Sequence, residues 1–245
     1  MPNRQEFVEA ARARDVPQEA VDEILRCLRP CVLVNKDGKG EPAGWWHGED
    51  ETAIVLDCAA LPGDHLDLGL GISTTGSLLL DHGFTPRWRP ATPTRDTGRG
   101  QQRREEDSGV LHARAAWTYA EWWSSSGDAL HPGDGHPALD EAIAEYERHL
   151  GPVEVVDPSL VPADLCLQLG GSLLRMPQDP PELALIGLDD DWNWEFTEEV
   201  RRKASAWKLF AQLHLPCDLE SYWLVHEDDR TVERWDRVVW TEQGD

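Results

Sequence analysis

Three stretches near the end of the chain decide the fold: LFAQLHL (209–215), SYWLVH (221–226) and RVVWT (237–241). Each is a short run of aliphatic, aromatic and β-branched residues, either continuous or alternating with polar residues, which is typical of β-strands. Only short polar connections separate them. The end of the chain is therefore predicted to form three consecutive strands.

Strands are also predicted in the first half and in the middle of the chain. The runs that indicate them are CVLVN (31–35), TAIVLDC (52–58), GSLLLDH (76–82), the first part of 110–123, VEVVD (153–157) and PELALIGL (181–188). Strands thus occur in both halves, with helices between them but without a regular alternation of strand and helix. This arrangement predicts an α+β fold of mostly antiparallel sheet with flanking helices.

Helices are predicted at the start of the chain and at two later positions. Residues 1–29 contain the capping-box spacing and the helix-starting proline of two short helices. PALDEAIAEYERHL (137–150) and TEEVRRKASAWKL (197–209) carry apolar residues at helical spacing. We therefore predict an N-terminal helical segment over residues 1–29 and one α+β domain over residues 30–245.

Residues 87–109 differ in composition from the rest of this domain. They are low in apolar residues, rich in Thr, Pro and Gly, and include six arginines. Such a segment cannot bury much surface, so we predict a flexible surface insertion.

Two segments of the domain are similar to each other. AIVLDCAALPGD (53–64) and KLFAQLHLPCD (208–218) both run from an apolar strand into Leu-Pro-x-Asp, and a second strand follows each. We interpret this similarity as a sign of two weakly similar half-units.

The charge of the chain restricts its partners. Residues 111–245 hold 10 Lys/Arg and 27 Asp/Glu, a net charge of -17, whereas the whole chain carries -23. Such a surface repels nucleic-acid phosphates and anionic lipid, so neither nucleic acid nor membrane is expected as a partner. It would accelerate the encounter with a basic protein, although acidity also serves solubility alone.

The cysteines and the first residues indicate the compartment. The five cysteines are odd in number and have no metal-binding spacing, and no apolar signal region or membrane-length apolar run occurs. We expect reduced thiols and a cytoplasmic location.

Motifs for catalysis are scarce. GISTTGS (71–77) lacks the G-x-S-x-G elbow of a hydrolase, and the Gly-rich stretches lack the lysine of a phosphate-binding loop. We assign no catalytic residue and no cofactor. The one candidate metal site, which would serve a metal-assisted hydrolase, combines His131, Asp134 and His136 of HPGDGH with the upstream His112. An exposed turn is the alternative interpretation of HPGDGH.

The segment DDDWNWEFTEE (189–199) is the candidate partner-binding site. Its alternating tryptophans lie on one face of an extended backbone, where they either join the core or form an interface hot spot with a carboxylate rim. The same alternatives apply to GWWHGED (44–50) and YAEWW (119–123). The residues assigned to partner binding are Asp189, Asp190, Asp191, Trp192, Trp194 and Glu195.

Four further residues stand out for their backbone or hydrogen-bonding capacity. Gly170 and Gly171 fit a turn that needs positive φ or close packing. Gln178 and Gln212 either satisfy buried backbone groups or contact a ligand. We expect all four to be structural.

Four segments, taken in order, resemble the YwqG-like family, a bacterial domain of unknown function. They are AIVLDCAALPGD with GSLLLDH, LCLQLGGSLLRMPQDP, WKLFAQLHLPCD, and YWLVHEDDRTVERWDRVVWTEQ, within residues 30–243. The chain is identified as a divergent member, because Leu173 replaces the family's Pro and His214 replaces its Asp.

The resemblance implies a single α+β domain of similar halves and no defined enzymatic activity. It also implies an accessory or immunity-type role in bacterial toxin systems. Together with the charge, it predicts a cytoplasmic binding protein for a basic partner such as a toxin. A small-molecule-binding scaffold between the two half-units is a further alternative.

Overall fold

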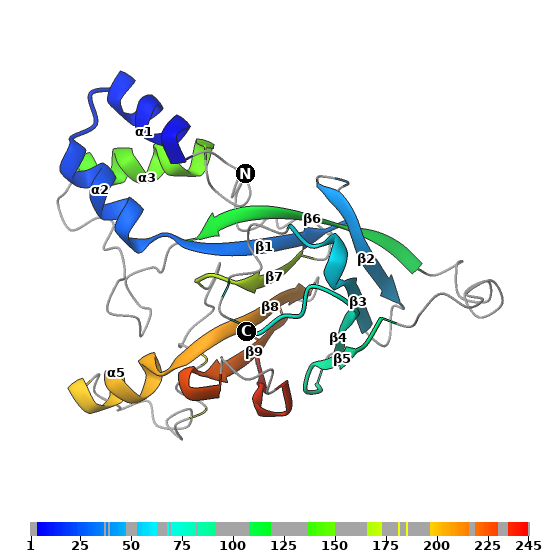
Figure 1. Cartoon of the computed structure of the whole chain (residues 1–245). Helices are drawn as coiled ribbons and strands as arrows, with labels where there is room; N and C mark the ends of the chain where they lie inside the picture. The colour runs from blue at the N-terminus through cyan, green and yellow to red at the C-terminus, as the bar shows by residue number, and fades with distance from the viewer. Residues whose placement is uncertain are drawn as a thin grey trace.

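The computed structural model describes residues 4–36, 38, 40–47, 53–62, 68, 70–81, 83–91, 108–118, 137–149, 166–172, 181, 185, 197–215, 219–229 and 235–244. Ten strands form one curled sheet, and every described pairing within it is antiparallel (Figure 1). The order across the sheet is β10-β9-β8-β7-β1-β6-β2-β3-β4-β5. Helices flank this sheet, so the predicted α+β class with a mostly antiparallel sheet is confirmed.

The strands have the following bounds: β1 (Arg29–Asn35), β2 (Glu41–His47), β3 (Ala53–Asp57), β4 (Ser77–Asp81), β5 (Arg87–Arg89), β6 (Ser108–Thr118), β7 (Cys166–Gly170), β8 (Trp207–Leu215), β9 (Leu219–His226) and β10 (Val239–Gly244). Strands β2 to β5 are neighbours in sequence order at one end of the sheet, and β7 to β10 are neighbours in sequence order at the other. The pair β1 and β6 lies between these two meanders.

The inner face of the curled sheet carries the main hydrophobic core. Every second residue of the central strands contributes to it, for example Val32 and Val34 of β1 and Leu167 and Leu169 of β7. Trp223 of β9 is fully buried in this core, and its indole Nε1 donates to the Phe84 carbonyl at 2.8 Å. This bond joins segments 139 residues apart in the sequence.

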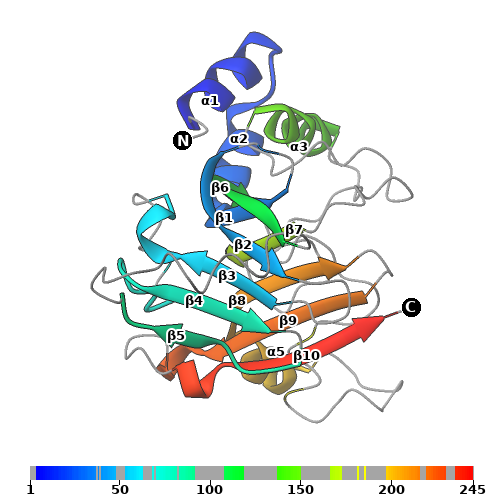
Figure 2. The same cartoon turned by 90° about the vertical axis from the view of Figure 1, so that its right-hand side faces the viewer.

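The two ends of the sheet approach each other as a result of the curl. Short strand β5 contacts the 3₁₀ turn η6 (Trp235–Arg237), which precedes β10 at the opposite end of the strand order. Figure 2 shows β4 and β5 lying beside β9 and β10. Curling in this way places the inner faces of both meanders around one shared core.

Three helices form a second layer beyond one end of β1 and β6: α1 (Arg4–Ala13), α2 (Gln18–Cys27) and α3 (Pro137–His149) (Figure 1). A separate apolar cluster joins them, in which the rings of Phe7 and Tyr146 meet edge to face. The Tyr146 hydroxyl donates to the Trp117 carbonyl at the end of β6. Arg14 pairs with the buried Glu145 carboxylate at 2.8 Å, which fixes α1 against α3.

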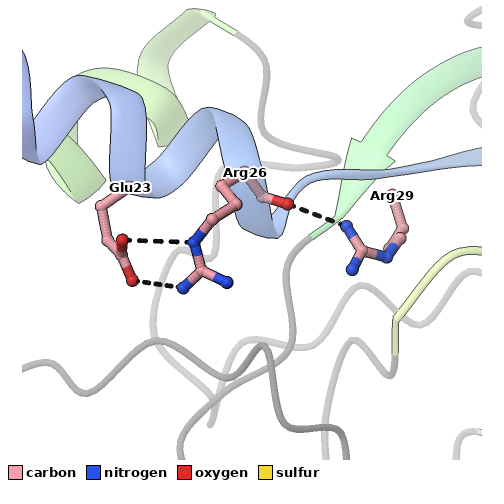
Figure 3. A network of polar contacts seen from close by, with 3 residues as sticks. All are labelled: Glu23, Arg26 and Arg29. Atoms are coloured by element: carbon pink, nitrogen blue, oxygen red, sulfur yellow. Dashed lines mark hydrogen bonds and ion pairs between the residues drawn. The ribbon is translucent and has the colours of Figure 1, made fainter.

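A polar network marks the passage from α2 into β1 (Figure 3). The Arg26 guanidinium donates two bonds to the Glu23 carboxylate, at 2.6 and 3.3 Å. Arg29, the first residue of β1, donates to the Arg26 carbonyl at 2.9 Å. A cation at the helix C-terminus offsets the partial negative charge of its last carbonyls, which stabilises this helix end.

Two predicted elements differ from the structure. Helix α5 (Glu198–Ser205) starts at the predicted cap, where the Thr197 hydroxyl accepts from the Val200 amide at 3.2 Å, but it ends before Trp207, which opens β8. Pro181 and Leu185 are the only described residues of the predicted strand at 181–188, and both have helical backbone. A short apolar run does not distinguish a strand from a buried helical turn, and proline suits a helix start.

Strand β2 was not predicted, because Pro42 and Gly44 are poor strand formers. The pairing with β6 shifts register between these two residues. A side chain at Gly44 would meet the Val55 carbonyl at 2.3 Å, so the close approach of β3 requires glycine here. Residues 119–123 and 153–157 lie outside the described residues. No described helix is both long and apolar enough to span a bilayer.

Candidate functional site

The outer face of the sheet is the surface from which a site can be built. Residues directly opposite each other in an antiparallel pair point to the same side, and side chains alternate along each strand. Because Val32, Leu111 and Leu167 lie in the core, their strand neighbours Leu33 and His112 project to the outer face. The register then assigns each remaining strand residue to one face.

Over β2 to β4 and the start of β6, the outer face carries an apolar row that we call the Trp45 stripe. Trp45 lies opposite Val110 of β6 and Val55 of β3, and Val55 lies opposite Leu79 of β4. Trp45 is 41 % exposed and Val110 is 50 % exposed. An exposed tryptophan on a flat strand surface is typical of an interface hot spot.

The alternation of β2 answers the question that GWWHGED raised from the sequence. Trp45 is on the outer face, whereas Trp46 packs against the main core with the Lys36 ammonium 3.2 Å from its ring centroid. One tryptophan of the pair is therefore largely structural and the other is available to a partner.

Over the central strands, the outer face carries a band of polar side chains beside two small apolar clusters, one of Cys31, Leu33 and Ala116 and one of Leu209, Tyr222 and Leu224. This polar band spans β6, β1, β7, β8 and β9 and consists of His112, Arg114, Asn35, Gln168, Gln212 and Glu220. Gln168, Gln212 and Glu220 are all buried. Buried polar groups on a sheet face are costly unless each is hydrogen-bonded, so their partners decide what the band does.

Gln168 holds the turn that follows β7. Its amide Nε2 donates to the carbonyls of Gly170 and Ser172, at 2.7 and 2.6 Å, and the Ser172 amide donates to the Thr118 hydroxyl at 2.8 Å. Gly170 and Gly171 have φ angles of 64° and 77°, in the left-handed region that favours glycine. Gln168 was not singled out from the sequence. Its alternation with two leucines in LCLQLGG could have identified it.

Gln212 and Glu220 form a buried pair on neighbouring strands. The Gln212 amide donates to the Glu220 carboxylate at 3.1 Å. Gln212, which the sequence singled out, therefore has a carboxylate as its hydrogen-bond partner. An amide donor to a carboxylate is a charge-assisted bond, which fixes both side chains in place.

Four atoms of the polar band are buried without a hydrogen-bond partner in the described part of the chain: Asn35 Oδ1, His112 Nδ1, Arg114 Nε and Gln168 Oε1. Asn35 lies directly opposite His112, while Arg114 and Gln168 flank Leu33 from its two sides. The group is therefore confined to three adjacent strands. Each unsatisfied buried donor or acceptor costs about 1–3 kcal/mol.

Some of the site residues predicted from the sequence lie in the described part of the chain, and others lie outside it. His112 lies on β6, while His131, Asp134 and His136 lie outside the described residues, as do Gln178 and the cluster of Asp189, Asp190, Asp191, Trp192, Trp194 and Glu195. Within the described ranges, no three His, Cys, Asp or Glu side chains are placed to hold a metal ion. His112 is instead a neighbour of Asn35 and Arg114.

Among the described residues, three side chains have shifted pKa values, each with a clear cause. Burial raises the pKa of the Cys58 thiol to about 11, and the Asp57 carboxylate acts in the same direction. A hydrogen bond from Lys203 lowers the pKa of Glu199 in the first turn of α5. Burial lowers the pKa of Arg4, whose guanidinium lies 3.8 Å from the Trp117 ring centroid. None of these groups belongs to the polar band.

Because comparisons with known proteins give no match, the function is argued from the sequence and the geometry alone. No protein-family model matches the chain, and no curated protein matches it either.

Proposed function

We propose that this chain is a binding protein whose acidic surface receives a basic protein partner. The observation that carries the proposal is an exposed tryptophan, Trp45, centred on an apolar row of a protein with a net charge of -23. Tryptophan anchors contribute much of the free energy of protein association, and excess charge accelerates the encounter with an oppositely charged partner.

The acidic residues near the Trp45 stripe support this proposal. Three carboxylate residues, Glu49, Asp50 and Glu51, follow β2 in the sequence before β3 begins. Among the described outer-face residues, Asp81 is paired with Arg87, so that carboxylate is already neutralised. The three acids after β2 lie outside the described residues, and in the sequence they add negative charge next to the strand that carries Trp45.

The C-terminal half provides the second part of the proposed surface. Its charge of -17 includes the cluster predicted from the sequence, which consists of Asp189, Asp190, Asp191, Trp192, Trp194 and Glu195. Among the described residues, Glu227 and Asp228 of η5 (Glu227–Asp229) are exposed and add to the same charge. A toxin neutralised by an immunity protein of this kind is one partner that would fit.

We also infer that the chain consists of two similar half-units. The two similar sequence segments fall on β3 and β8, and each of these is the second strand of its own four-strand meander. The equivalent positions of β3 and β8 support this inference.

Affinity capture followed by a salt titration tests the proposed function. The bait is the full chain, compared with Trp45→Ala and with a triple variant in which Asp189, Asp190 and Asp191 become Asn. We expect one basic protein to bind the wild type, to dissociate as salt increases, and to bind Trp45→Ala at least 10-fold more weakly. The triple variant should show a shallower salt dependence. Binding that neither salt nor these variants change would overturn the proposal.

A further inference from the structure

Arg114 is the most unusual side chain of the polar band. It lies on the outer face of β6, half-buried, with its Nε atom buried. In the part of the chain that the structure describes, it has neither a hydrogen bond nor an ion pair. This is notable because the sequence supplies 46 acidic residues against 23 basic ones, so a carboxylate partner would be easy to provide. A guanidinium stays charged in proteins, so burial without an anion is costly.

The atoms around Arg114 define what a ligand would have to offer. The Gln168 Oε1 atom is an acceptor, because the Nε2 atom of the same amide already donates to two carbonyls. Asn35 Oδ1 is a second buried acceptor, and His112 Nδ1 lies opposite it on β6. The set therefore combines one cationic donor with two acceptors and one imidazole nitrogen. A complementary molecule carries an anionic group and also at least one N–H or O–H group.

The surroundings limit the size of such a molecule. Cys31, Leu33 and Ala116 are buried together on the same outer face and supply a small apolar floor. Neighbouring strands are about 4.8 Å apart, so the band across β6, β1 and β7 spans only about 10 Å. It lies between the two meanders, on the central pair of strands and its neighbour. This span suits a small molecule better than a protein surface.

We propose that the outer face of β6, β1 and β7 binds a small carboxylate that also carries hydroxyl or amino groups, with Arg114 as its principal contact. The planar guanidinium matches a carboxylate through two parallel hydrogen bonds. The hydroxyl or amino group donates to Asn35 or Gln168. This site is separate from the Trp45 stripe, so it does not depend on the proposed protein partner.

Calorimetric titration with L-malate tests the ligand class. The neutral malamide and inorganic phosphate serve as comparison probes. We expect malate to bind the wild type, malamide to bind at least 10-fold more weakly, and Arg114→Gln to weaken malate binding at least 10-fold. The matched control is Arg89→Gln, which removes the same charge from an exposed arginine on the outer face of β5 and should change malate affinity less than twofold.

Three results would overturn the assignment. Phosphate binding more tightly than malate would show that the site does not select carboxylates. Failure of malate to bind the wild type at millimolar concentration, or equal losses in Arg114→Gln and Arg89→Gln, would show that Arg114 forms no such site.

The stability of the ligand-free protein gives an independent test. A structural arginine destabilises the fold when it is replaced, whereas a charge kept for a ligand costs stability in its absence. Arg114→Met retains the apolar stem and removes the charge. We expect its unfolding midpoint in ligand-free buffer to rise by about 2–4 °C, with no change for Arg89→Met. A fall in the midpoint of Arg114→Met would contradict the proposal.

Discussion

The inner and outer faces of the same central strands carry different kinds of side chain. On the inner face, Val34, Ala113 and Leu167 lie side by side in an apolar core. One residue further along the same strands, the outer face carries Arg114 and Gln168. The inner face is apolar at these positions, whereas on the outer face the half-buried Arg114 and the buried Gln168 lie beside the small apolar cluster of Cys31, Leu33 and Ala116.

This difference separates side chains that stabilise the fold from side chains that folding does not explain. Burial of apolar area on the inner face stabilises the fold by about 25 cal/mol per Å² and needs no further explanation. A polar side chain at Gln168 is explained by the turn it holds, because its amide bonds Gly170 and Ser172. Arg114 Nε has no hydrogen-bond partner among the described residues, and this is the basis of the proposed ligand site.

The inner face should respond most strongly to truncation of a buried ring. Trp223→Ala removes the largest fully buried side chain among the described residues, together with the bond from its indole to the Phe84 carbonyl. We expect the free energy of unfolding to fall by about 3–5 kcal/mol, measured by urea denaturation. A loss below about 1 kcal/mol would mean that the core does not join the two ends of the sheet.

The turn after β7 should be the most sensitive point on the outer face. At Gly171, an added Cβ would meet the Thr118 hydroxyl at 2.4 Å and Cys31 Cβ at 2.8 Å. Gly171→Ala should therefore lose about 2–4 kcal/mol from left-handed strain and overpacking together. Gly83 has a φ of 81° with no atom within 4 Å of an added Cβ, so Gly83→Ala should lose only about 1–2 kcal/mol. Equal losses in the two variants would exclude the steric contribution at Gly171.

The inner face could be predicted from the sequence better than the outer one. Continuous apolar runs identified β1, β3, β4, β8 and β9, because such runs report burial directly. Strand β2 could not be predicted, since its proline and glycine are tolerated only through a register shift and a close approach by β3. These features depend on residues distant in the sequence.

The polar band could be predicted only in part. The alternation of LHARAA (111–116) already places His112 and Arg114 on one side of a strand. That they lie beside Asn35 and near Gln168 depends on the pairing of β6, β1 and β7, which are separated by long stretches of chain. The sequence instead linked His112 with His131 and His136, which are close to each other in sequence but lie outside the described residues.

The pH dependence of the free energy of unfolding should report the burial of Cys58, which belongs to the main core. Because its thiol pKa is raised from 9.0 to about 11, the unfolded chain loses this proton between pH 9 and 11 while the folded chain retains it. Stability should therefore fall by about 1–2 kcal/mol as pH rises through this window, and this group should cause no further loss above it. Cys58→Ala should show a smaller slope over the same range. Parallel slopes would mean that Cys58 is not shielded in the folded protein.

The smallest effect on stability should come from the exposed ring of the outer face. Trp45→Ala removes a side chain that is 41 % exposed and has its exposed neighbour Val110 on one side. Since much of its area already contacts water, we expect a loss of about 1 kcal/mol or less by urea denaturation. A loss as large as that of Trp223→Ala would make Trp45 a structural residue. A small loss combined with reduced partner binding would separate the two tryptophans by role, because one face of the sheet would then hold the fold while the other recognises a partner.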